Sequence, residues 1–256
     1  MTLTPEEKSA IERAVVRGWP ALETTVIDGW LARWSSGGSV RANSVAALEF
    51  CGTDFDAALQ RVVGFYRQRG GVPRFTITDV VVPDRLDARL EQRGWQRHGE
   101  HVTFAKDVTG RDAAPHHGTP GIRIEMHAKP THAWSEVYLA GLSPDSQGIA
   151  LRLVEGTPAP RVFVTGLRDG VVIASGLSVL DGRLASVQCM ATVAAARRTG
   201  AATAILSAIE SHALANGVCR LYLQTDAANT GAISVYTRYG FSLAGHYHTR
   251  VFPVSG

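Results

Sequence analysis

The stretch VQCMATVAAARRTGAATAIL, residues 187–206, decides how this chain is expected to fold. Its first part, 187–193, is an apolar run of strand length, and its alanine-rich last part opens a helix at Gly200. The turn between them carries Arg197 and Arg198. A strand that passes through such a turn into a helix directs unpaired backbone N–H groups and the positive end of the helix dipole at one point. The stretch therefore predicts a site for an anion such as a pyrophosphate, although a strand-to-helix turn without a ligand would have a similar composition.

The segment downstream continues this pattern of helix, strand and helix. The helix 201–215 ends at Asn216-Gly217, and residues 218–225 alternate as a strand does. A further helix begins at Asn229 and ends near Tyr239.

Together the two segments resemble the GCN5-related N-acetyltransferase (GNAT) family. The acyl-CoA-binding signature of that family is Q/R-x-x-G-x-G/A, and the residues that match it here are Arg197, Gly200 and Ala202. The pattern N-x-x-A-x-x-x-Y-x-x-x-G-F is similar to the family's second CoA-binding block, and its fixed positions are Asn229, Ala232, Tyr236, Gly240 and Phe241. Two blocks in the right order, separated by one helix and one strand, are more specific than either alone.

The resemblance implies that acetyl-CoA is the cofactor and that residues of both blocks contact it. These contacts are expected at Met190, Ala191, Thr192, Val193, Arg197, Arg198, Thr199, Gly200, Ala201, Ala202, Asn229 and Tyr236. The family's architecture implies that strand 187–193 is splayed from its neighbour, so that its N–H groups can reach the pantetheine and the thioester oxygen. It also implies that Tyr236 is catalytic and protonates the leaving thiolate. The residue types alone leave Tyr236 open as a core tyrosine and Asn229 as a helix N-cap.

The general base has no clear candidate in this sequence. Many members of the family place a glutamate on the central strand, whereas this chain has Gln188 and Cys189 there. Candidates elsewhere are His246, His248 and Glu155, or a chain of water molecules. Cys189 as a covalent nucleophile lacks an assignable His/Asp partner, so direct attack by the amine is favoured.

An internal repeat indicates two copies of one α/β unit. A shift of 146 residues lays the segment 54–104 over 200–250 without a gap, so that the helix stop, strand, helix and Gly-aromatic pair coincide. The expected fold is therefore α/β, with two tandem GNAT-like domains, each a mixed and mostly antiparallel sheet flanked by helices. The expected division is a first domain at 1–108, a linker at 109–120 and a catalytic domain at 121–256.

The first copy is expected to be degenerate. Asp54 stands where the second copy has Gly200, and Cys51 stands where it has Arg197, so a carboxylate occupies the phosphate position. Leu90 likewise replaces Tyr236. The first copy is expected to pack against the active one and to form a wall of its substrate groove.

Composition narrows the class of protein. The 256 residues carry a formal charge of +3 with basic and acidic residues interspersed, which argues against a nucleic-acid-binding face. Three scattered cysteines predict neither a disulfide framework nor a metal site, and His116-His117 has no partner at ligand spacing. No apolar run is long enough to cross a bilayer, so we expect a cytoplasmic monomer or homodimer with no membrane partner.

The sequence favours an acetyl-CoA-dependent N-acetyltransferase that acts on a small-molecule or peptide amine. The alternative is a non-catalytic acyl-CoA-binding sensor, which the missing strand glutamate supports. The acceptor is expected to be chosen by a loop near residues 134–142, by a hairpin at the end of the chain and by the first domain.

Several elements are predicted from local signals in the rest of the chain. Thr4 and Glu7 form a capping box for a helix to about residue 17, and Asp28-Gly29 predicts a hairpin. Residues 40–48 are expected as a strand and residues from about 131 to 142 as a helix. Residues 143–148 are expected as a loop that leads into a helix at 149–155.

Overall fold

The computed structural model describes residues 3–108 and 119–253, so most of the predicted linker lies outside the described residues, as do His116 and His117. The elements of the first half are α1 (Pro5–Gly18), β1 (Glu23–Ile27), β2 (Trp30–Trp34), η1 (Arg41–Asn43), β3 (Val45–Ala46), α2 (Phe55–Arg67), β4 (Arg74–Thr78), α3 (Leu86–Glu91) and β5 (Gln96–Asp107). Those of the second half are β6 (Arg123–His127), α4 (His132–Leu139), α5 (Pro144–Glu155), β7 (Arg161–Arg168), β8 (Val171–Asp181), β9 (Leu184–Ser186), β10 (Gln188–Thr192), η2 (Ala194–Ala196), α6 (Ala201–Ala215), β11 (Arg220–Asp226), α7 (Thr230–Arg238) and β12 (Ser242–Val251).

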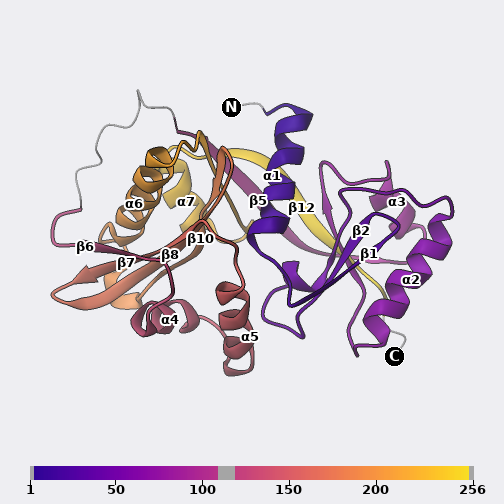
Figure 1. The fold of residues 1–256 in the computed structure, drawn as a ribbon, viewed down its shortest axis with the longest axis horizontal. Coiled ribbons are helices and arrows are strands. Elements are labelled where there is room, and N and C mark those ends of the chain that lie inside the picture. The colour runs from indigo at the N-terminus through magenta and orange to yellow at the C-terminus, as the bar shows by residue number, and fades with distance from the viewer. Residues whose placement is uncertain (1–2, 109–118, 254–256) are drawn as a thin grey trace.

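The strands form one continuous sheet that runs through both halves (Figure 1). Its order is β1-β2-β3-β4-β12-β5-β11-β9-β8-β7-β6, and β10 pairs with β8 beside this path. Most neighbours are antiparallel, while the pairs β3·β4 and β9·β11 are parallel. The predicted class, α/β with a mixed and mostly antiparallel sheet flanked by helices, is confirmed.

The two halves exchange their last strands at the centre of this sheet. β5 lies between β11 and β12, and β12 lies between β4 and β5. The ladder between β5 and β12 pairs Ser242 with Ala105 at one end and Val251 with Gln96 at the other. The shift of 146 residues converts one pair into the other, since 242 − 146 is 96 and 105 + 146 is 251, so the ladder has approximate two-fold symmetry.

The sequence repeat corresponds to a structural repeat. Shifted by 146 residues, α2 falls on α6, β4 on β11, α3 on α7 and β5 on β12. Each helix pair buries its own cluster of apolar side chains: α2 and α3 cover Trp30 and Phe75, while α6 and α7 cover Val102 and Leu221. The boundaries proposed for two domains stay a prediction, because β5 belongs to the first copy in sequence and to the second copy's sheet in space.

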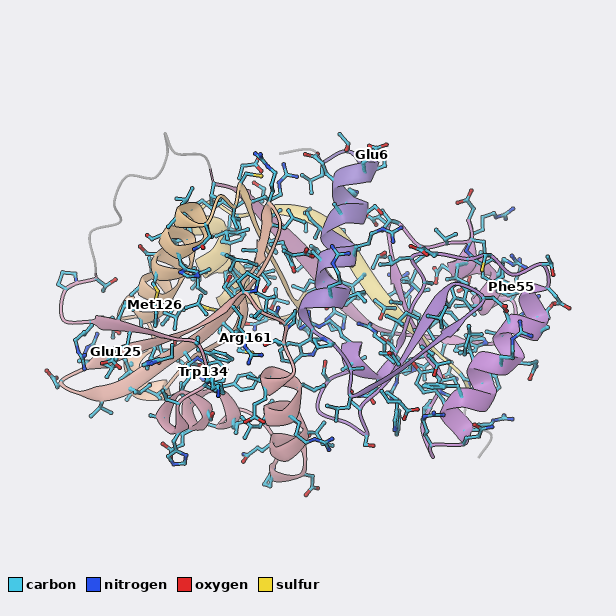
Figure 2. All side chains as sticks on the ribbon, viewed as in Figure 1. Glu6, Phe55, Glu125, Met126, Trp134 and Arg161 are labelled. Carbon is cyan, nitrogen blue, oxygen red and sulfur yellow. The ribbon has the colours of Figure 1, made fainter. Side chains whose placement is uncertain are left out.

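Different helices cover the two faces of the second half's sheet (Figure 1). α6 and α7 pack on one face. On the other face α4 and α5 enclose Trp134, labelled in Figure 2, whose Nε1 donates to the carbonyl of Gly176 at 2.9 Å. α1 packs on this second face too, against Ala105 of β5 and Tyr222 of β11. α1 therefore belongs to the first half in sequence but covers strands at the junction of the halves.

Some local predictions are confirmed and others are wrong. The Thr4 capping box and the Asp28-Gly29 hairpin are present. The strand expected at 40–48 is a 3-10 turn followed by the two-residue strand β3, because Asn43 and Ser44 bond to nearby backbone groups. The loop expected at 143–148 is wrong, since α5 begins at Pro144 and includes it.

The helix expected from about residue 131 to 142 is present as α4, so the segment near 134–142 that is expected to help choose the acceptor is helical and not a loop. The expected final hairpin is wrong. β12 has no antiparallel partner in β11, because β5 lies between them. No helix among residues 3–108 and 119–253 is long and apolar enough to span a membrane.

The strand exchange predicts that the two halves stay together when the chain is cut. A protease site placed within residues 109–118 should give two pieces that elute as one 1:1 complex, because β5 pairs along most of its length with both β11 and β12. Size-exclusion chromatography with light scattering measures the mass. Two separate folded pieces, each at its own mass, would contradict the exchange.

Candidate functional site

The structure opens between β10 and β11. β9 pairs in parallel with β11 over Leu184–Ser186, and the last hydrogen bond of this pair runs from the N–H of Val187 to the carbonyl of Tyr222 at 2.8 Å. Beyond it, within the part of the chain that the structure describes, β10 pairs only with β8, and β11 pairs only with β5. The edge of β10 that faces β11 therefore carries N–H and C=O groups without a strand partner.

A bulge at Cys189 causes this separation. Cys189 has a φ of +52°, in the left-handed region that a side chain rarely adopts. The register of β10 against β8 shifts between Gln188 and Ala191, so the strand bends at this residue. The splay that the sequence resemblance implied is therefore present, and its local cause is this bulge.

A cavity of about 340 Å³ lies at the splay. Its lining includes Tyr222 on the α1 face of the sheet and Tyr236 among the residues packed under α6 and α7, so it passes between the strands from one face to the other. The residues that line it are Val15, Trp19, Gly38, Ser39, Arg41, Tyr138, Val187, Gln188, Cys189, Met190, Tyr222, Leu223, Gln224, Thr225, Asn229, Ala232 and Tyr236. The first five belong to the first half, so that half forms one wall, as expected.

The N-terminus of α6 follows the end of β10. Gly200 is its N-cap, with a φ of +86° and no side chain to bond the first turn. Ala204 donates to the carbonyl of Gly200 at 2.9 Å, so the earlier amides of Ala201, Ala202 and Thr203 have no partner within the helix. A Cβ at Gly200 would lie 2.7 Å from Cγ2 of Thr119, so glycine is required by the backbone and by this contact.

The equivalent turn of the first copy is closed by its own side chain. Asp54, at the position of Gly200, is the N-cap of α2, and its carboxylate accepts from the N–H of Ala57 at 3.0 Å. The N–H of Ala57 in α2 therefore has a hydrogen-bond partner, whereas the equivalent N–H of Thr203 in α6 has none within its helix. This contrast supports the prediction that the first copy is degenerate.

Two arginines lie at the turn before α6. Arg197 and Arg198 are exposed, and neither forms an ion pair with another described residue. Arg198 has a φ of +63°, and the hydroxyl of Thr199 donates to the carbonyl of Ala196 at 2.7 Å. The hydrogen bond from Thr199 orders the turn, and both guanidinium groups lie at its rim.

Tyr236 lies on α7 and lines the cavity. Its side chain is buried beside Phe241, with ring centroids 6.0 Å apart. Burial raises the pKa of Tyr236 to about 12, so the phenol keeps its proton at neutral pH. This position agrees with both interpretations of Tyr236 that the sequence left open, because the ring packs in the core and the residue also lines the cavity.

The other predicted cofactor contacts divide into two groups. Met190 and Asn229 line the cavity, while Ala191, Thr192 and Val193 continue β10 toward the turn. Asn229 is the N-cap of α7, and its Oδ1 accepts from the N–H of Ala232 at 3.1 Å. Its part in binding a cofactor stays a prediction.

None of the predicted bases lies at the cavity. His248 is buried, and its Nε2 lies 2.9 Å from the Asp87 carboxylate, which also binds Arg250, so it has a structural role. His246 and Glu155 are exposed and away from the residues that line the cavity. No Asp, Glu or His belongs to that lining among the described residues.

Cys189 is unsuited to act as a nucleophile. Burial raises the pKa of its thiol to about 12, so little thiolate exists at neutral pH. Among residues 3–108 and 119–253 no three His, Cys, Asp or Glu side chains are grouped so that they could hold a metal ion.

Sequence reasoning missed a group of five residues at or beside the cavity. Nη1 of Arg41 donates to Oε1 of Gln224 at 3.0 Å, and the Arg41 guanidinium lies 5.8 Å from the centre of the Trp19 ring. Gln224 also donates from Nε2 to Oγ1 of Thr103 at 3.0 Å and approaches Oε1 of Glu12 at 3.4 Å. The available signal was Glu12 beside Ile11 on the apolar face of α1, an acidic residue where the helix packs on the sheet.

Glu12 has a perturbed pKa. Burial raises the pKa of its carboxyl to about 7, while the charges of Arg41 and Arg33 oppose the rise. The carboxyl is thus about half ionised near neutral pH.

The comparisons with known proteins agree with one another on the family that this chain resembles. A family model described as "Probable histone acetyltransferase Rv0428c C-terminal" matches residues 6–252. An uncharacterized N-acetyltransferase, YobR of Bacillus subtilis, is 25% identical over 248 residues, which cover 94% of this chain and 97% of that protein.

Solved structures share the fold. A GCN5-related N-acetyltransferase from Kribbella flavida superposes with a TM-score of 0.73 at 14% identity and covers 100% of this chain and 97% of its own. A tandem GNAT protein from the clavulanic acid biosynthesis pathway has a TM-score of 0.59 at 14% identity, over 78% of this chain and 70% of its own.

The raised pKa of Glu12 predicts a pH-dependent stability. Because the folded-state pKa of about 7 lies above the ordinary glutamate pKa of 4.5, the stabilisation is full below pH 4.5 and is lost as the pH rises through 7. Glu12→Gln removes this loss, so the variant should exceed wild type in free energy of unfolding by about 1 to 2 kcal/mol at pH 8.5, allowing for partial solvent screening. The difference should disappear at pH 4.

Denaturant unfolding at pH 4, 5.5 and 8.5 measures this difference. Glu6→Gln on the same helix is the matched control, since Glu6 is exposed and its pKa is lowered by a backbone hydrogen bond, so its effect should not grow between pH 5.5 and 8.5. An equal gain for Glu12→Gln at pH 4 and pH 8.5 would show that its carboxyl is not perturbed.

Proposed function

The chain belongs to the GCN5-related N-acetyltransferases, in the family of the Rv0428c C-terminal model, and we propose that it transfers an acetyl group from acetyl-CoA to a primary amine. The observation that carries the proposal is the cavity at the splay of β10 and β11, beside the uncapped N-terminus of α6. The family consists of acyltransferases, whereas the donor, the acceptor and the roles of single residues are our proposals.

The residues present fit acetyl-CoA. The amides of Ala201, Ala202 and Thr203, which have no partner within the helix, suit a pyrophosphate together with the helix dipole behind them, and Arg197 and Arg198 add positive charge. The open edge of β10 offers N–H groups of the kind that a pantetheine amide needs. Met190, Asn229 and Tyr236 would surround the acyl end, since they line the cavity.

Acetyl-CoA, when bound, supplies the activated acetyl group that the amine attacks directly. The amides at the edge of β10 would orient the carbonyl and bind the negative charge that develops on its oxygen. Tyr236 holds at its hydroxyl the proton that the departing thiolate needs, and its raised pKa keeps that proton in place before the reaction. The wall from the first half would limit the access of water.

Deprotonation of the amine requires no side chain of the cavity in this proposal. The absence of Asp, Glu and His from its described lining favours water as the proton acceptor. The same observation favours the second candidate, a protein that binds acyl-CoA without turnover.

Tyr236→Phe tests the acid role of the phenol, and thiol release by the wild-type protein separates the enzyme from the sensor. We expect turnover of the variant to fall by roughly 100-fold or more, because a general acid typically contributes that much, while the dissociation constant of acetyl-CoA changes less than about twofold, since only one hydroxyl is lost. Thiol release from acetyl-CoA with a panel of amines measures turnover, and calorimetry measures binding.

Tyr66→Phe is the control, because its hydroxyl bonds the carbonyl of Arg33 in the first half, away from the cavity. Wild-type turnover in Tyr236→Phe would assign that ring to packing alone. Binding of acetyl-CoA without thiol release for any amine would favour the sensor.

A further inference from the structure

Arg41 is a cation in the cavity wall that forms no ion pair with a carboxylate among the described residues. Other arginines of the described chain, such as Arg17, Arg220 and Arg250, pair with Asp or Glu. Arg41 is half-buried, and among the described residues its guanidinium makes one hydrogen bond, to the neutral Gln224. Since a guanidinium has five N–H donors, four remain available.

The position of Arg41 is fixed by its neighbours. Gln224 accepts from Arg41 and donates to Thr103, so the amide cannot turn without loss of a bond. Trp19 lies against the guanidinium, with the two 5.8 Å apart, in cation–π contact. A charged group held by two such contacts is preorganised to bind a ligand.

The surroundings of Arg41 carry excess positive charge. Arg33, Arg41 and Glu12 line a second, small cavity of about 20 Å³ behind Gln224. Arg33 is 3% exposed, and its Nη1 has no hydrogen-bond partner among the described residues. Two guanidinium groups thus face one carboxyl, whose pKa is raised to about 7 by burial, so Glu12 offsets at most one of them. Nearby Asp79 and Asp181 are already paired, with Lys8 and Arg17.

The same wall contains a further polar atom without a partner. Oε1 of Gln188 is buried and has no hydrogen-bond partner in the described part of the chain. Gln188 lines the cavity with Arg41. Buried polar groups without partners are costly, and a bound ligand can satisfy them.

We propose that the acceptor is an amine that also carries an anionic group, a carboxylate or a phosphate, and that Arg41 binds that anion. The inference rests on the proposed function, because it assigns the acceptor side of the same cavity. A guanidinium forms paired charge-assisted hydrogen bonds with either anion. A basic lysine-rich peptide, the class that the family description suggests, would instead bring further positive charge beside Arg33 and Arg41.

The test compares acceptors that differ in the anion. L-phenylalanine is compared with phenethylamine for the carboxylate, O-phosphoethanolamine with ethanolamine for the phosphate, and a histone H3 tail peptide serves as the basic substrate. kcat/KM is measured for each amine with acetyl-CoA, and the affinity of each amine for the CoA-saturated protein is measured by calorimetry. We expect at least one anionic amine to exceed its neutral partner by about tenfold or more in one of these quantities.

Variants of Arg41 test whether this side chain causes the preference for anionic amines. Arg41→Gln should reduce the anionic-to-neutral ratio to about one, and Arg41→Lys should restore part of it, because lysine keeps the charge but not the paired geometry. Arg152→Gln is the control, since Arg152 is exposed on α5 and its side chain has no ion pair among the described residues. The dissociation constant of acetyl-CoA should stay within about twofold in all three variants.

Each of the other outcomes contradicts either the anion site or the proposed function. No anionic preference in wild type, or a preference that persists in Arg41→Gln, overturns the anion site. A histone peptide preferred by wild type and used better by Arg41→Gln overturns it as well. Failure of wild type to bind acetyl-CoA refutes the proposed function instead, and calorimetry with acetyl-CoA alone detects that failure.

Discussion

The structure depends on one interruption of strand pairing. β9 and β11 pair up to the hydrogen bond between Val187 and Tyr222, and the bulge at Cys189 then directs β10 away. A sheet normally satisfies the backbone groups on both sides of an inner strand, so the interruption leaves N–H and C=O groups that need another partner. The cavity, the position of Tyr236 and the approach to the N-terminus of α6 all follow from it.

The exchange of β5 and β12 explains why both halves are needed at one site. Because each half's last strand completes the sheet next to the other half, α1 is held against β5 and β11. This contact places Trp19 and Arg41 opposite β10 and β11. The first half has closed its own turn with Asp54, and its present contribution is a wall of the second half's cavity. A copy whose own turn is closed can therefore be retained for the shape and charge that it provides.

Sequence reasoning succeeded where a local interaction determines the structure. Thr4 and Gly200 mark helix starts through hydrogen bonds or backbone freedom within a few residues, and each begins a helix as predicted. The repeat at 146 residues gave the equivalence of α2 with α6. The strand exchange was not predicted, because the pairing of β5 with β11 joins residues more than 100 positions apart and no local signal encodes it. Arg41 and Glu12 were missed for the same reason, since their position beside the cavity is set by hydrogen bonds with Gln224 of the other half.

The central claim is that open amides at β10 and α6 bind acetyl-CoA while the matching turn of the first copy does not. Hydrogen exchange with and without acetyl-CoA measures this claim amide by amide. The account predicts that the ligand slows exchange by about tenfold or more at Ala201, Ala202 and Thr203 and along Gln188–Thr192, with no change at Phe55–Ala57 in α2. No slowing at the start of α6, or equal slowing at α2, would contradict it.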